Sequence, residues 1–481
     1  MMISTLNNKR VLIVGAGITG MSVARFLDRN DISFELVDSA LTDSIVGDEG
    51  KRPDVLRGKA LHQSFSDALF NGFDVIVLSP GVPRNLAPVQ SALAHGVDVI
   101  GDIELFANAA NAPVIAVTGS NGKSTVVSWI ADVLNAADVR AILCGNIGTP
   151  ALDSLTDDAE CYVLELSSYQ LESTRSLKPL TATVLNVSDD HLDRYDSIEH
   201  YAAVKRSVLT LAQSIVVNED DPRTWPIAQN DKTHDKFDAS ASNSNDVRDC
   251  RASQCVSAVS LVIDEPSKLS AEAGDNTRWH RRTHENSVWL CRNDEPLIDQ
   301  TRLSVPGEHN VLNALSVLAL IEPLGVSMDA VLERLPNFTG LPHRTESLGE
   351  HKGVRWYNDS KGTNIDACIK AIEAMPGPVI LIAGGIGKDA DFSELGPAVQ
   401  ARVSKVVLIG QDADSIATAL APFTACLRAD SLEAAVELAA ALASSGDVVL
   451  LSPACSSFDM FNSYEHRGER FKTLFREVIA A

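Results

Sequence analysis

The octapeptide Thr118-Gly-Ser-Asn-Gly-Lys-Ser-Thr125 lies between two hydrophobic patterns of different period. The apolar run Pro113-Val-Ile-Ala-Val117 before it predicts a buried strand, and a helical pattern begins after it near Val126. A strand, a glycine loop and a helix in this order form a cradle for phosphate, because backbone N–H groups and the helix N-terminus face the anion. In such a cradle Lys123 supplies a cation and the hydroxyl group of Ser124 can hold Mg²⁺.

The loop is a shortened form of the common phosphate-binding motif. That motif has a glycine six residues before its lysine, but Val117 occupies this position. Gly119 and Gly122 remain, and they let the backbone approach a phosphate where side chains would obstruct it. The alternative is an ordinary glycine-containing turn between a strand and a helix. We favour the phosphate site, because a buried strand, two glycines and a Lys-Ser-Thr helix start rarely coincide without a phosphate.

Size and composition limit the possible functions. A chain of 481 residues is too long for one core and suggests two to four domains, with three the natural number. Its 45% hydrophobic and 22% charged residues are typical of a soluble globular protein. The net charge of −23 argues against nucleic acid as a partner, since a phosphate backbone calls for a basic surface.

The cysteines and the N-terminus indicate a cytoplasmic protein. The eight cysteines are scattered without any CxxC pair, so we expect neither a zinc site nor a disulfide framework. The first ten residues run directly into a strand and leave no room for a signal peptide. No apolar run is long enough to cross a bilayer, so we expect no membrane insertion.

Strand and helix patterns alternate along the chain, which predicts doubly wound parallel sheets. We expect three consecutive α/β domains: a Rossmann-like domain (1–101), a central P-loop ATPase-like mononucleotide-binding domain (102–340) and a Rossmann-like C-terminal domain (341–481). The expected strands are 10–14, 33–37, 75–78, 97–100, 113–117, 161–165, 182–186, 214–218, 260–263, 287–291, 379–383, 405–409 and 447–451. The expected helices include one that ends near Arg29, one from about 310 to 324 and one over 431–443.

Two segments of the central domain depart from this alternation. Residues 229–257 are polar and lack periodicity, so we expect a surface insertion without a part in the chemistry. The strand-like pieces 260–263 and 287–291 that follow would form an antiparallel edge of the central sheet.

A second glycine pattern follows the first strand. Gly15, Gly17 and Gly20, with Asp38 eighteen residues after the last of them, fit the fingerprint of a dinucleotide site. Taken alone, the pattern would favour a dehydrogenase, although any nucleotide diphosphate could use the same turn. A second nucleotide loop at 118–125 has no purpose in a simple dehydrogenase. Two cradles indicate one nucleotide for energy and another as a handle on the substrate.

Two further residues lie at strand ends near the phosphate loop. Glu165 ends one predicted strand, and His191 follows the next. Ligands of α/β sheets gather at the carboxyl ends of strands, and a carboxylate suits Mg²⁺. Each residue alone could be structural, Glu165 as a helix N-cap partner or ion-pair member and His191 as a hydrogen-bonded turn residue. Together they favour an enzyme that uses ATP.

Several motifs in the same order resemble the Mur ligase family, bacterial enzymes that build the stem peptide of peptidoglycan. The matching segments are 118–125, Gly145-Asn-Ile-Gly148, 165–172, Asp190-His-Leu-Asp-Arg-Tyr195, Gly307-Glu-His-Asn310, Gly340-Leu-Pro-His-Arg344 and Asn358-Asp-Ser-Lys-Gly-Thr-Asn364. The resemblance covers essentially the whole chain apart from the polar insertion. Gly119–Thr125 and Leu451-Ser-Pro-Ala-Cys-Ser-Ser-Phe-Asp459 most resemble the branch that adds D-glutamate. The Asp-Asn-Pro-Arg motif of the diaminopimelate-adding branch is absent. Folylpolyglutamate synthase shares the central fold but has no N-terminal domain like residues 1–101.

The resemblance implies a reaction. The chain would be an ATP-dependent ligase that joins D-glutamate to UDP-N-acetylmuramoyl-L-alanine through an acyl phosphate, with Mg²⁺ as a cofactor. It would act as a monomer on these small molecules. Two rival classes explain less: a nicotinamide oxidoreductase leaves the loop at 118–125 unused, and a non-catalytic nucleotide sensor need not retain Glu165, His191 and Lys205 together.

The resemblance also implies roles for matching residues. ATP would be bound by Gly119, Ser120, Asn121, Gly122, Lys123, Ser124, Thr125, Asn310, Asn313, Arg344 and Asp359. Mg²⁺ would be held by Ser124, Glu165 and Lys205, the last as a carbamate, and Lys123, His191 and Lys205 would be catalytic. The sugar nucleotide would lie on Gly15, Gly17, Thr19, Ser39, Ser79, Gly81, Asn146 and His191. The acyl phosphate and D-glutamate would meet Lys361, Thr363, Lys388, Ser457 and Phe458. The chain departs from the family in one place, because Ser39-Ala40 replaces the Thr-Arg that often follows the strand-end aspartate.

Overall fold

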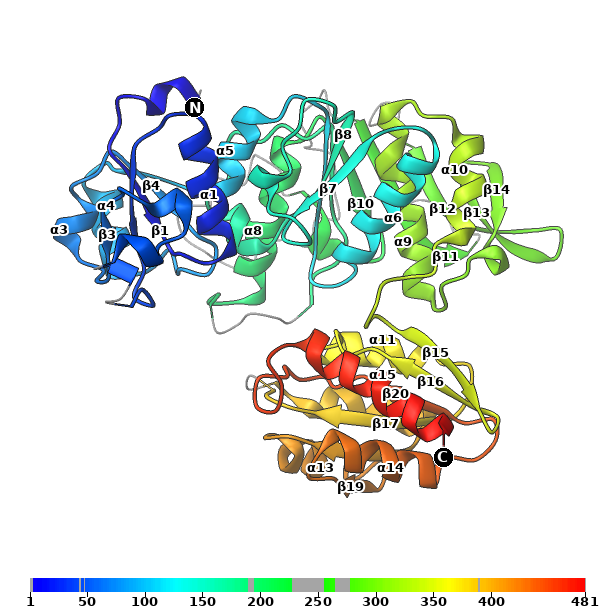
Figure 1. Ribbon diagram of the computed structural model, residues 1–481. Coiled ribbons are helices and arrows are strands. Elements are labelled where there is room, and N and C mark those ends of the chain that lie inside the picture. Colours follow the sequence, from blue (N-terminus) through cyan, green and yellow to red (C-terminus); the bar gives the residue numbers. More distant parts are fainter. Residues whose placement is uncertain are drawn as a thin grey trace. The chain divides into compact units, whose positions relative to one another are not determined.

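The computed structural model describes residues 3–42, 45–46, 48–188, 194–226, 255–263, 277–387 and 390–480 (Figure 1). The chain divides into two compact units. The first comprises Met1–Val187, Asp196–Ile298 and Ala314–Leu335, and the second comprises Ser188–Tyr195, Asp299–Asn313 and Pro336–Ala481. The first unit holds two sheets and the second holds a third, so the prediction of three α/β domains is confirmed.

The N-terminal sheet has the strand order β3-β2-β1-β4-β5, and all of its pairs are parallel. Its strands are β1 (Val11–Val14), β2 (Phe34–Val37), β3 (Leu61–His62), β4 (Val75–Leu78) and β5 (Asp98–Ile100). Its helices are α1 (Ile18–Arg29), α3 (Asp67–Phe70) and α4 (Ala87–Ala94), with short 3₁₀ turns at Ile3–Leu6, Glu49–Lys51 and Asp54–Leu56. The order reverses between β1 and β4, and such a switch point opens a crevice at the carboxyl ends of the strands.

The central sheet has nine strands in the order β14-β13-β12-β11-β10-β9-β6-β8-β7. They are β6 (Val114–Thr118), β7 (Ala141–Gly145), β8 (Cys161–Glu165), β9 (Thr181–Val184), β10 (Ser214–Asn218), β11 (Cys255–Ile263), β12 (Thr277–His284), β13 (Ser287–Arg292) and β14 (Glu295–Asp299). The associated helices are α5 (Asp102–Ala109), α6 (Lys123–Ala136), α7 (Ser168–Leu171), α8 (Ile198–Leu211), α9 (Glu308–Ile321) and α10 (Met328–Arg334). 3₁₀ turns lie at Ala151–Asp153, Pro222–Thr224, Gln300–Arg302, Glu322–Leu324 and Leu335–Asn337. β6 lies between β8 and β9 and is parallel to both, so its carboxyl end is a second switch point.

Two expectations about the central domain were wrong. The strand at 260–263 is not part of an antiparallel edge, because β11 is parallel to both β10 and β12, whereas β12 and β13 are antiparallel. β12 was missed because its sequence, Thr-Arg-Trp-His-Arg-Arg-Thr-His, shows no apolar alternation. β11 starts at Cys255, so the last residues of the expected insertion belong to a strand. The rest of that insertion, up to residue 254, lies outside the described residues.

The C-terminal sheet has the order β15-β16-β20-β17-β18-β19, and β15 is its antiparallel member. Its strands are β15 (Glu346–His351), β16 (Val354–Asn358), β17 (Val379–Gly384), β18 (Val403–Ile409), β19 (Cys426–Arg428) and β20 (Val448–Leu451). Its helices are α11 (Ile365–Glu373), α12 (Gly396–Arg402), α13 (Ala413–Leu420), α14 (Leu432–Leu442) and α15 (Tyr464–Ala480), and Phe392–Leu395 is a 3₁₀ turn.

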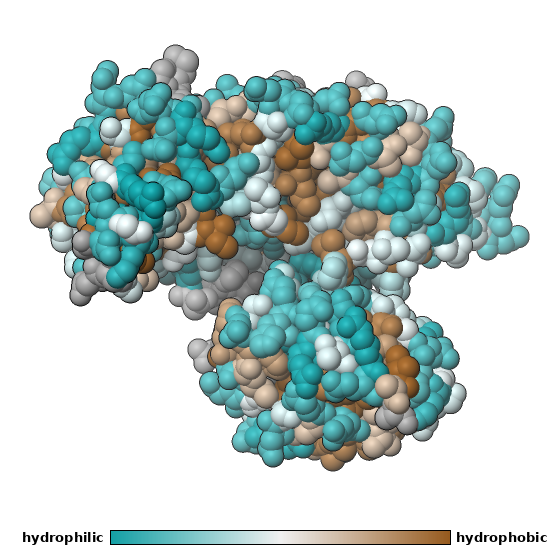
Figure 2. Space-filling view, in the orientation of Figure 1, coloured by the Kyte–Doolittle hydropathy of each residue, from teal (hydrophilic) through white to brown (hydrophobic). Residues whose placement is uncertain are grey.

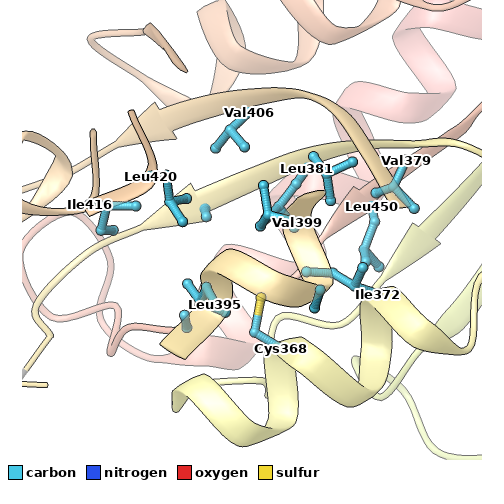
Figure 3. Close-up of a cluster of buried hydrophobic side chains, with 14 of the residues drawn as sticks. Cys368, Ile372, Val379, Leu381, Leu395, Val399, Val406, Ile416, Leu420 and Leu450 are labelled. Atoms are coloured by element: carbon cyan, nitrogen blue, oxygen red, sulfur yellow. The ribbon is translucent and has the colours of Figure 1, made fainter. Parts of the chain in front are cut away.

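Both faces of this sheet are covered, as its unbroken apolar strands require. Along β17, Val379 and Leu381 face a cluster that includes Ile372 of α11 and Leu420 of α13 (Figure 3). Ile380, which alternates with them, faces the opposite cluster, to which α14 and α15 contribute. This two-residue period keeps the strand fixed in register and holds its carboxyl end, with the loop that follows, in place.

The surface seen in Figure 2 is largely hydrophilic on both units, in keeping with the high charge of the chain. Within the described part of the chain, no helix is both long enough and apolar enough to cross a membrane. No two of the cysteines whose side chains the structure describes are joined by a disulfide bond.

Candidate active site

A cavity of about 510 Å³ lies at the switch point of the N-terminal sheet. The loops that follow β1 and β4 form one wall, and residues that follow β7, together with Gln170 of α7, form the other. Six residues predicted to bind the sugar nucleotide line it: Gly15, Gly17, Thr19, Ser79, Gly81 and Asn146. The other lining residues are Ile18, Asp38, Pro80, Val82, Gly145, Gly148, Pro150 and Gln170. Ser39, which was predicted with the first group, is exposed and lies outside the lining.

Close packing requires glycine at two of the three positions of the pattern in this cavity, Gly15 and Gly20. Gly15 has a φ of +100°, and a Cβ atom there would lie 2.8 Å from the hydroxyl oxygen of Ser79. A Cβ atom on Gly20 would clash with the carbonyl oxygen of Gly15. The Ser79 hydroxyl group also donates a hydrogen bond to that carbonyl at 3.4 Å. The loop therefore presents bare backbone to the cavity, which suits a close approach by a diphosphate.

Asp38 and Ile18 complete the rim of the cavity. In dinucleotide sites the acid at the position of Asp38 binds a ribose hydroxyl. Here one carboxylate oxygen accepts from the N–H of Ala16 at 2.6 Å, and the other accepts from Ala40 at 2.7 Å. Both oxygens thus help to hold the loops that follow β1 and β2. Ile18, at the start of α1, is 78% exposed, so it offers an apolar surface to a flat ring.

The phosphate loop follows β6, and α6 begins at Lys123, three residues earlier than expected. Gly122 has a φ of +83°, and a Cβ atom on Gly119 would lie 3.1–3.3 Å from Leu185 and Asn186. The Lys123 ammonium group donates to the carbonyl oxygens of Gly119 and Ser120, each at 2.8 Å. It is therefore held at the centre of the loop, where a phosphate can exchange for the carbonyl partners.

Asn186, which the sequence reasoning did not identify, braces this loop from the end of β9. Its side-chain oxygen accepts from the N–H of Asn121 at 2.8 Å, and its amide donates to the Asn121 carbonyl at 3.1 Å. Its own carbonyl accepts from the N–H of Ser120 at 2.9 Å. Val117, at the position of the missing glycine, is buried inside β6. The shortened loop is thus shaped by a neighbouring strand end, with no need of a third glycine.

Glu165 meets the requirements of a magnesium ligand. It ends β8, beside β6, and is only 2% exposed. Its Oε1 atom accepts from the Asn146 side chain at 2.8 Å. Its Oε2 atom is buried and receives no hydrogen bond from any described residue. A buried carboxylate oxygen without a donor is unfavourable unless a cation binds it, and Mg²⁺ prefers oxygen ligands. Ser124, the other predicted ligand, is buried at the start of α6.

Lys205 of α8 reaches the same loop. The side chain is 1% exposed, and its Nζ atom donates to the carbonyl oxygen of Gly119 at 2.9 Å. It also lies over the ring of Tyr201, 4.5 Å from the centroid. The fold thus brings a buried lysine against the phosphate loop, where the resemblance requires one. His191, which was predicted to be catalytic, lies outside the described residues.

Several predicted residues of the second unit follow the carboxyl ends of β16 and β20. Asp359 is buried, and its carboxylate accepts from the Ser452 hydroxyl at 2.6 Å and the Thr345 N–H at 3.0 Å. Burial raises the pKa of Asp359 to about 6, against the opposing hydrogen bonds and the charge of Arg344. The Lys361 ammonium group lies 3.8 Å from the centroid of the Tyr464 ring.

The remaining predicted residues of this unit differ in exposure. Ser457 is buried, whereas the neighbouring Phe458 is 72% exposed. Thr363 donates its N–H to the carbonyl oxygen of Lys361 at 2.8 Å. Lys388 lies outside the described residues.

Arg467 of α15 connects the two loops of this site, and no sequence pattern predicted this role. It is 1% exposed and donates to the Ser360 hydroxyl at 3.0 Å, the Ser360 carbonyl at 2.9 Å and the Cys455 carbonyl at 3.2 Å. Burial lowers the pKa of Arg467 to about 10, although Cys455 and two nearby aspartates oppose the change. An arginine in an amphipathic helix is expected to be exposed to solvent, so no sequence pattern distinguishes Arg467 from an ordinary surface residue.

Two asparagines predicted to bind ATP, Asn310 and Asn313, lie at the start of α9. The side chain of Asn310 donates to the Pro306 carbonyl at 2.7 Å, and Asn313 donates to the side-chain oxygen of Asn310 at 3.1 Å. Both asparagines are buried. Burial and the charge of Lys370 lower the pKa of the adjacent His309 to about 4, so this imidazole is neutral at pH 7.

Three family models match the chain in the order of its three sheets. They describe a Mur ligase MurD-like N-terminal domain over residues 9–101, a Mur ligase middle domain over 117–321, and a Mur ligase glutamate ligase domain over 343–455.

Curated relatives align along the whole chain. A Legionella pneumophila (strain Lens) protein named UDP-N-acetylmuramoylalanine–D-glutamate ligase is 40% identical over 478 residues, which are 98% of this chain and 100% of the relative. A protein of the same name from Marinobacter nauticus is 41% identical over 474 residues, 98% of each chain.

Solved structures of related enzymes have the same fold. UDP-N-acetylmuramate–alanine ligase MurC from Thermotoga maritima has a TM-score of 0.55 at 18% identity, and the match covers 98% of this chain and 100% of that one. A pseudomurein peptide ligase type C from Methanothermus fervidus has a TM-score of 0.57 at 17% identity with the same coverage. At these identities the likeness shows the fold alone. The family models and the full-length relatives show more: this chain belongs to the Mur ligase family.

Proposed function

We propose that this chain uses ATP to join D-glutamate to UDP-N-acetylmuramoyl-L-alanine, the reaction named for its curated relatives. The observation that carries the proposal is the link between the cavity and the phosphate loop through Asn146. Asn146 lines the cavity, and both its N–H and its side-chain amide donate to Glu165, at 2.9 and 2.8 Å. A substrate held in the cavity by its nucleotide can therefore reach the phosphate site with its other end.

The chemistry of the reaction fits these residues. A carboxylate is a poor electrophile, and transfer of a phosphoryl group from ATP supplies it with a leaving group. Lys123 would neutralise charge on the transferring phosphoryl group from the centre of its loop. Ser124, Glu165 and a carbamylated Lys205 would hold Mg²⁺, which supplies further positive charge at the phosphates when bound. A carbamate turns the Lys205 amine into an anionic ligand, which a buried site beside a cation would favour.

The second unit would supply the amino acid. Lys361, Thr363, Lys388, Ser457 and Phe458 would surround the acyl phosphate and D-glutamate, whose amine attacks the acyl carbon and displaces phosphate. Asn310, Asn313, Arg344 and Asp359 would complete the ATP site, and His191 with Asn146 would contact the muramoyl-alanine part. All three substrates are small and water-soluble, in accord with a monomeric enzyme acting in the cytoplasm.

The test is release of phosphate from ATP by the purified chain with Mg²⁺, followed together with the mass of the nucleotide product. We expect stoichiometric phosphate and a product larger by one glutamate only when the UDP-sugar and D-glutamate are both present. L-glutamate should not replace the D isomer, and Lys123→Ala should abolish release while the thermal melt stays intact. Release with L-glutamate at the same rate, or a product without the added residue, would contradict the proposal.

A further inference from the structure

Helix α5 carries two buried carboxyl groups in its first turn, Asp102 and Glu104. It runs from the N-terminal sheet to the central sheet within the first unit. Buried acids are rare and unfavourable unless hydrogen bonds compensate for the lost hydration. Neither residue belongs to the phosphate loop or to the set predicted from the sequence, so both require another explanation.

Both acids hold the same segment of the central domain, but by different means. Glu104 accepts from the backbone N–H groups of Arg175 at 2.7 Å and Ser176 at 3.0 Å, so it fixes only main chain. Asp102 accepts from the Nε2 atom of Gln170 at 3.2 Å. Gln170 lines the cavity at the N-terminal switch point. Asp102 is thus one hydrogen bond away from the cavity, whereas Glu104 acts on the backbone behind it.

The other end of the Gln170 amide is also fixed. Its Oε1 atom accepts from the N–H of Ser167 at 3.1 Å and from the Ser167 hydroxyl at 3.2 Å, which caps α7. A rotation of the amide by 180° would place Oε1 against the Asp102 carboxylate and the NH₂ group against the Ser167 N–H. Both new contacts would be repulsive, so one orientation is selected. An amide nitrogen carries two hydrogens, and no described residue other than Asp102 accepts from this one.

We propose that Asp102 is a positioning residue for the sugar nucleotide: it orients Gln170 so that the second N–H of the amide donates to an uncharged oxygen of the substrate in the cavity. The inference rests on the proposed function, because it takes a sugar nucleotide as the occupant. The acceptor would be a hydroxyl or an amide carbonyl of the sugar part, since Asn146 and the glycine loop already provide donors elsewhere on the wall.

The choice of a carboxylate supports this role. A carboxylate accepts and never donates, so it enforces one orientation of Gln170, whereas an asparagine could present either end of its amide. The Asp102 carboxylate lowers the stability of the fold, because its Oδ1 atom is buried and has no hydrogen-bond partner among the described residues. Burial raises the pKa of Asp102 to about 6, against the hydrogen bond from Gln170 and the nearby N–H groups of Ile103 and Asp102. A residue with only a packing role would not need this charge.

The experiment measures the KM values of the full chain for all three substrates in two single variants. Asp102→Ala should raise the KM for UDP-N-acetylmuramoyl-L-alanine at least tenfold, with less than twofold change in the KM for ATP and D-glutamate. Glu104→Ala is the matched control, since it loosens the same segment without touching Gln170. It should lower the melting temperature and leave the KM for the sugar nucleotide within twofold.

A double-mutant cycle separates positioning from general damage. On a Gln170→Ala background, Asp102→Ala should change that KM by less than twofold, because the amide it orients is already gone. If the alanine variant does not fold, Asp102→Asn replaces it, because asparagine keeps the volume of the side chain. We expect this variant to raise the KM for the sugar nucleotide about threefold.

The outcomes distinguish this inference from the function it rests on. Additive effects in the cycle, an equal rise in KM in Glu104→Ala, or an unchanged KM in a folded Asp102 variant would overturn the positioning role while ligation continues. Absence of ligation by the unaltered chain would remove the proposed function, and this inference with it.

Discussion

Asp102 and Asp153 are two residues of the first unit whose surroundings shift their pKa values in opposite directions. Burial is the largest effect on Asp102, and it raises the pKa to about 6. Burial alone would also raise the pKa of Asp153, but the hydrogen bonds from Arg25, the nearby Ser22 hydroxyl group and the charges of Arg25 and Arg29 outweigh it and lower the pKa. The Arg25–Asp153 ion pair, at 2.5 Å, joins α1 to the turn before β8.

These shifts predict opposite pH dependences of stability. The folded chain binds the Asp102 proton more tightly than the unfolded chain, so this group lowers stability as the pH rises from about 4 to about 6. The difference in free energy of unfolding between Asp102→Asn and the unaltered chain should therefore shift in favour of the variant by on the order of 1 kcal/mol when the pH is raised from 5 to 7.5. Asp153 contributes stability above its unfolded pKa, which is lost only as the pH falls through its folded pKa.

Urea unfolding of both variants at pH 5 and pH 7.5 checks this prediction. Asp153→Asn is the control of opposite sign and should be destabilised at pH 7.5. A difference between Asp102→Asn and the unaltered chain that does not change with pH would show that Asp102 is not desolvated as described.

Motif residues were the part of the site that the sequence could predict. The octapeptide and its family resemblance identified Lys123, Glu165 and Lys205, and the fold brings all three to one loop. Gln170 and Asn186 were not identified as contributors. Each is a polar residue at a strand end or helix start, where an ordinary cap would have the same sequence, and only three-dimensional contacts distinguish them.

At the scale of elements, apolar runs were sufficient to find the buried parallel strands and insufficient for the rest. β1, β6, β8 and β17 are buried along their whole length and are apolar except for the last residues of β6 and β8, as expected for parallel strands that are covered on both faces. β12 lacks such a run, because its side chains are mostly Arg, His and Thr. Strand direction near the edge depends on these pairings, so the sequence could not give it.

Helix α15 has an element-scale role that depends on Arg467. The guanidinium group satisfies carbonyl oxygens of the loops after β16 and β20, which hold Ser360, Cys455 and the residues proposed for D-glutamate. Arg467→Met keeps the aliphatic volume and removes the donors, so buried carbonyls lose their partners at about 1–3 kcal/mol each. We expect a lower free energy of unfolding and a KM for D-glutamate raised about tenfold.

Arg470, on the same helix, is the matched control. Its guanidinium group forms ion pairs with Glu433 and Glu477 at the surface, and exposed pairs contribute little. Arg470→Met should leave both the urea midpoint and the KM nearly unchanged. If Arg467→Met behaves in the same way, the two loops do not depend on this arginine.

For the molecule as a whole, the order of three α/β domains followed from the sequence because each has its own alternation of strands and helices. The polar stretch of the central domain had no such pattern, and most of it lies outside the described residues. The net charge also follows directly from the sequence, and it should affect the association rate of the substrate. The chain carries a net charge of −23, and Asp38 is the charged side chain among the residues that line the described cavity.

A diphosphate substrate should therefore approach against electrostatic repulsion. The association rate of the UDP-sugar, measured by stopped flow without ATP, should rise about twofold between 10 and 150 mM salt as screening increases. Sucrose at matched viscosity is the control for changes in diffusion. A rate that falls with salt would mean that a local positive potential, rather than the net charge, governs encounter.

For inhibitor design, the rim of the cavity offers two kinds of contact, which differ in how easily a mutation can remove them. A compound that gains affinity by covering the exposed side chain of Ile18 relies on a residue that the fold hardly needs, since surface substitutions change stability by about 0.5 kcal/mol or less. Resistance could arise there by a single replacement. A compound that hydrogen-bonds the backbone at Gly15 relies on a position where a new side chain would clash with Ser79. A substitution there would destabilise the enzyme, and the melting temperatures of Ile18→Thr and Gly15→Ala would show the contrast.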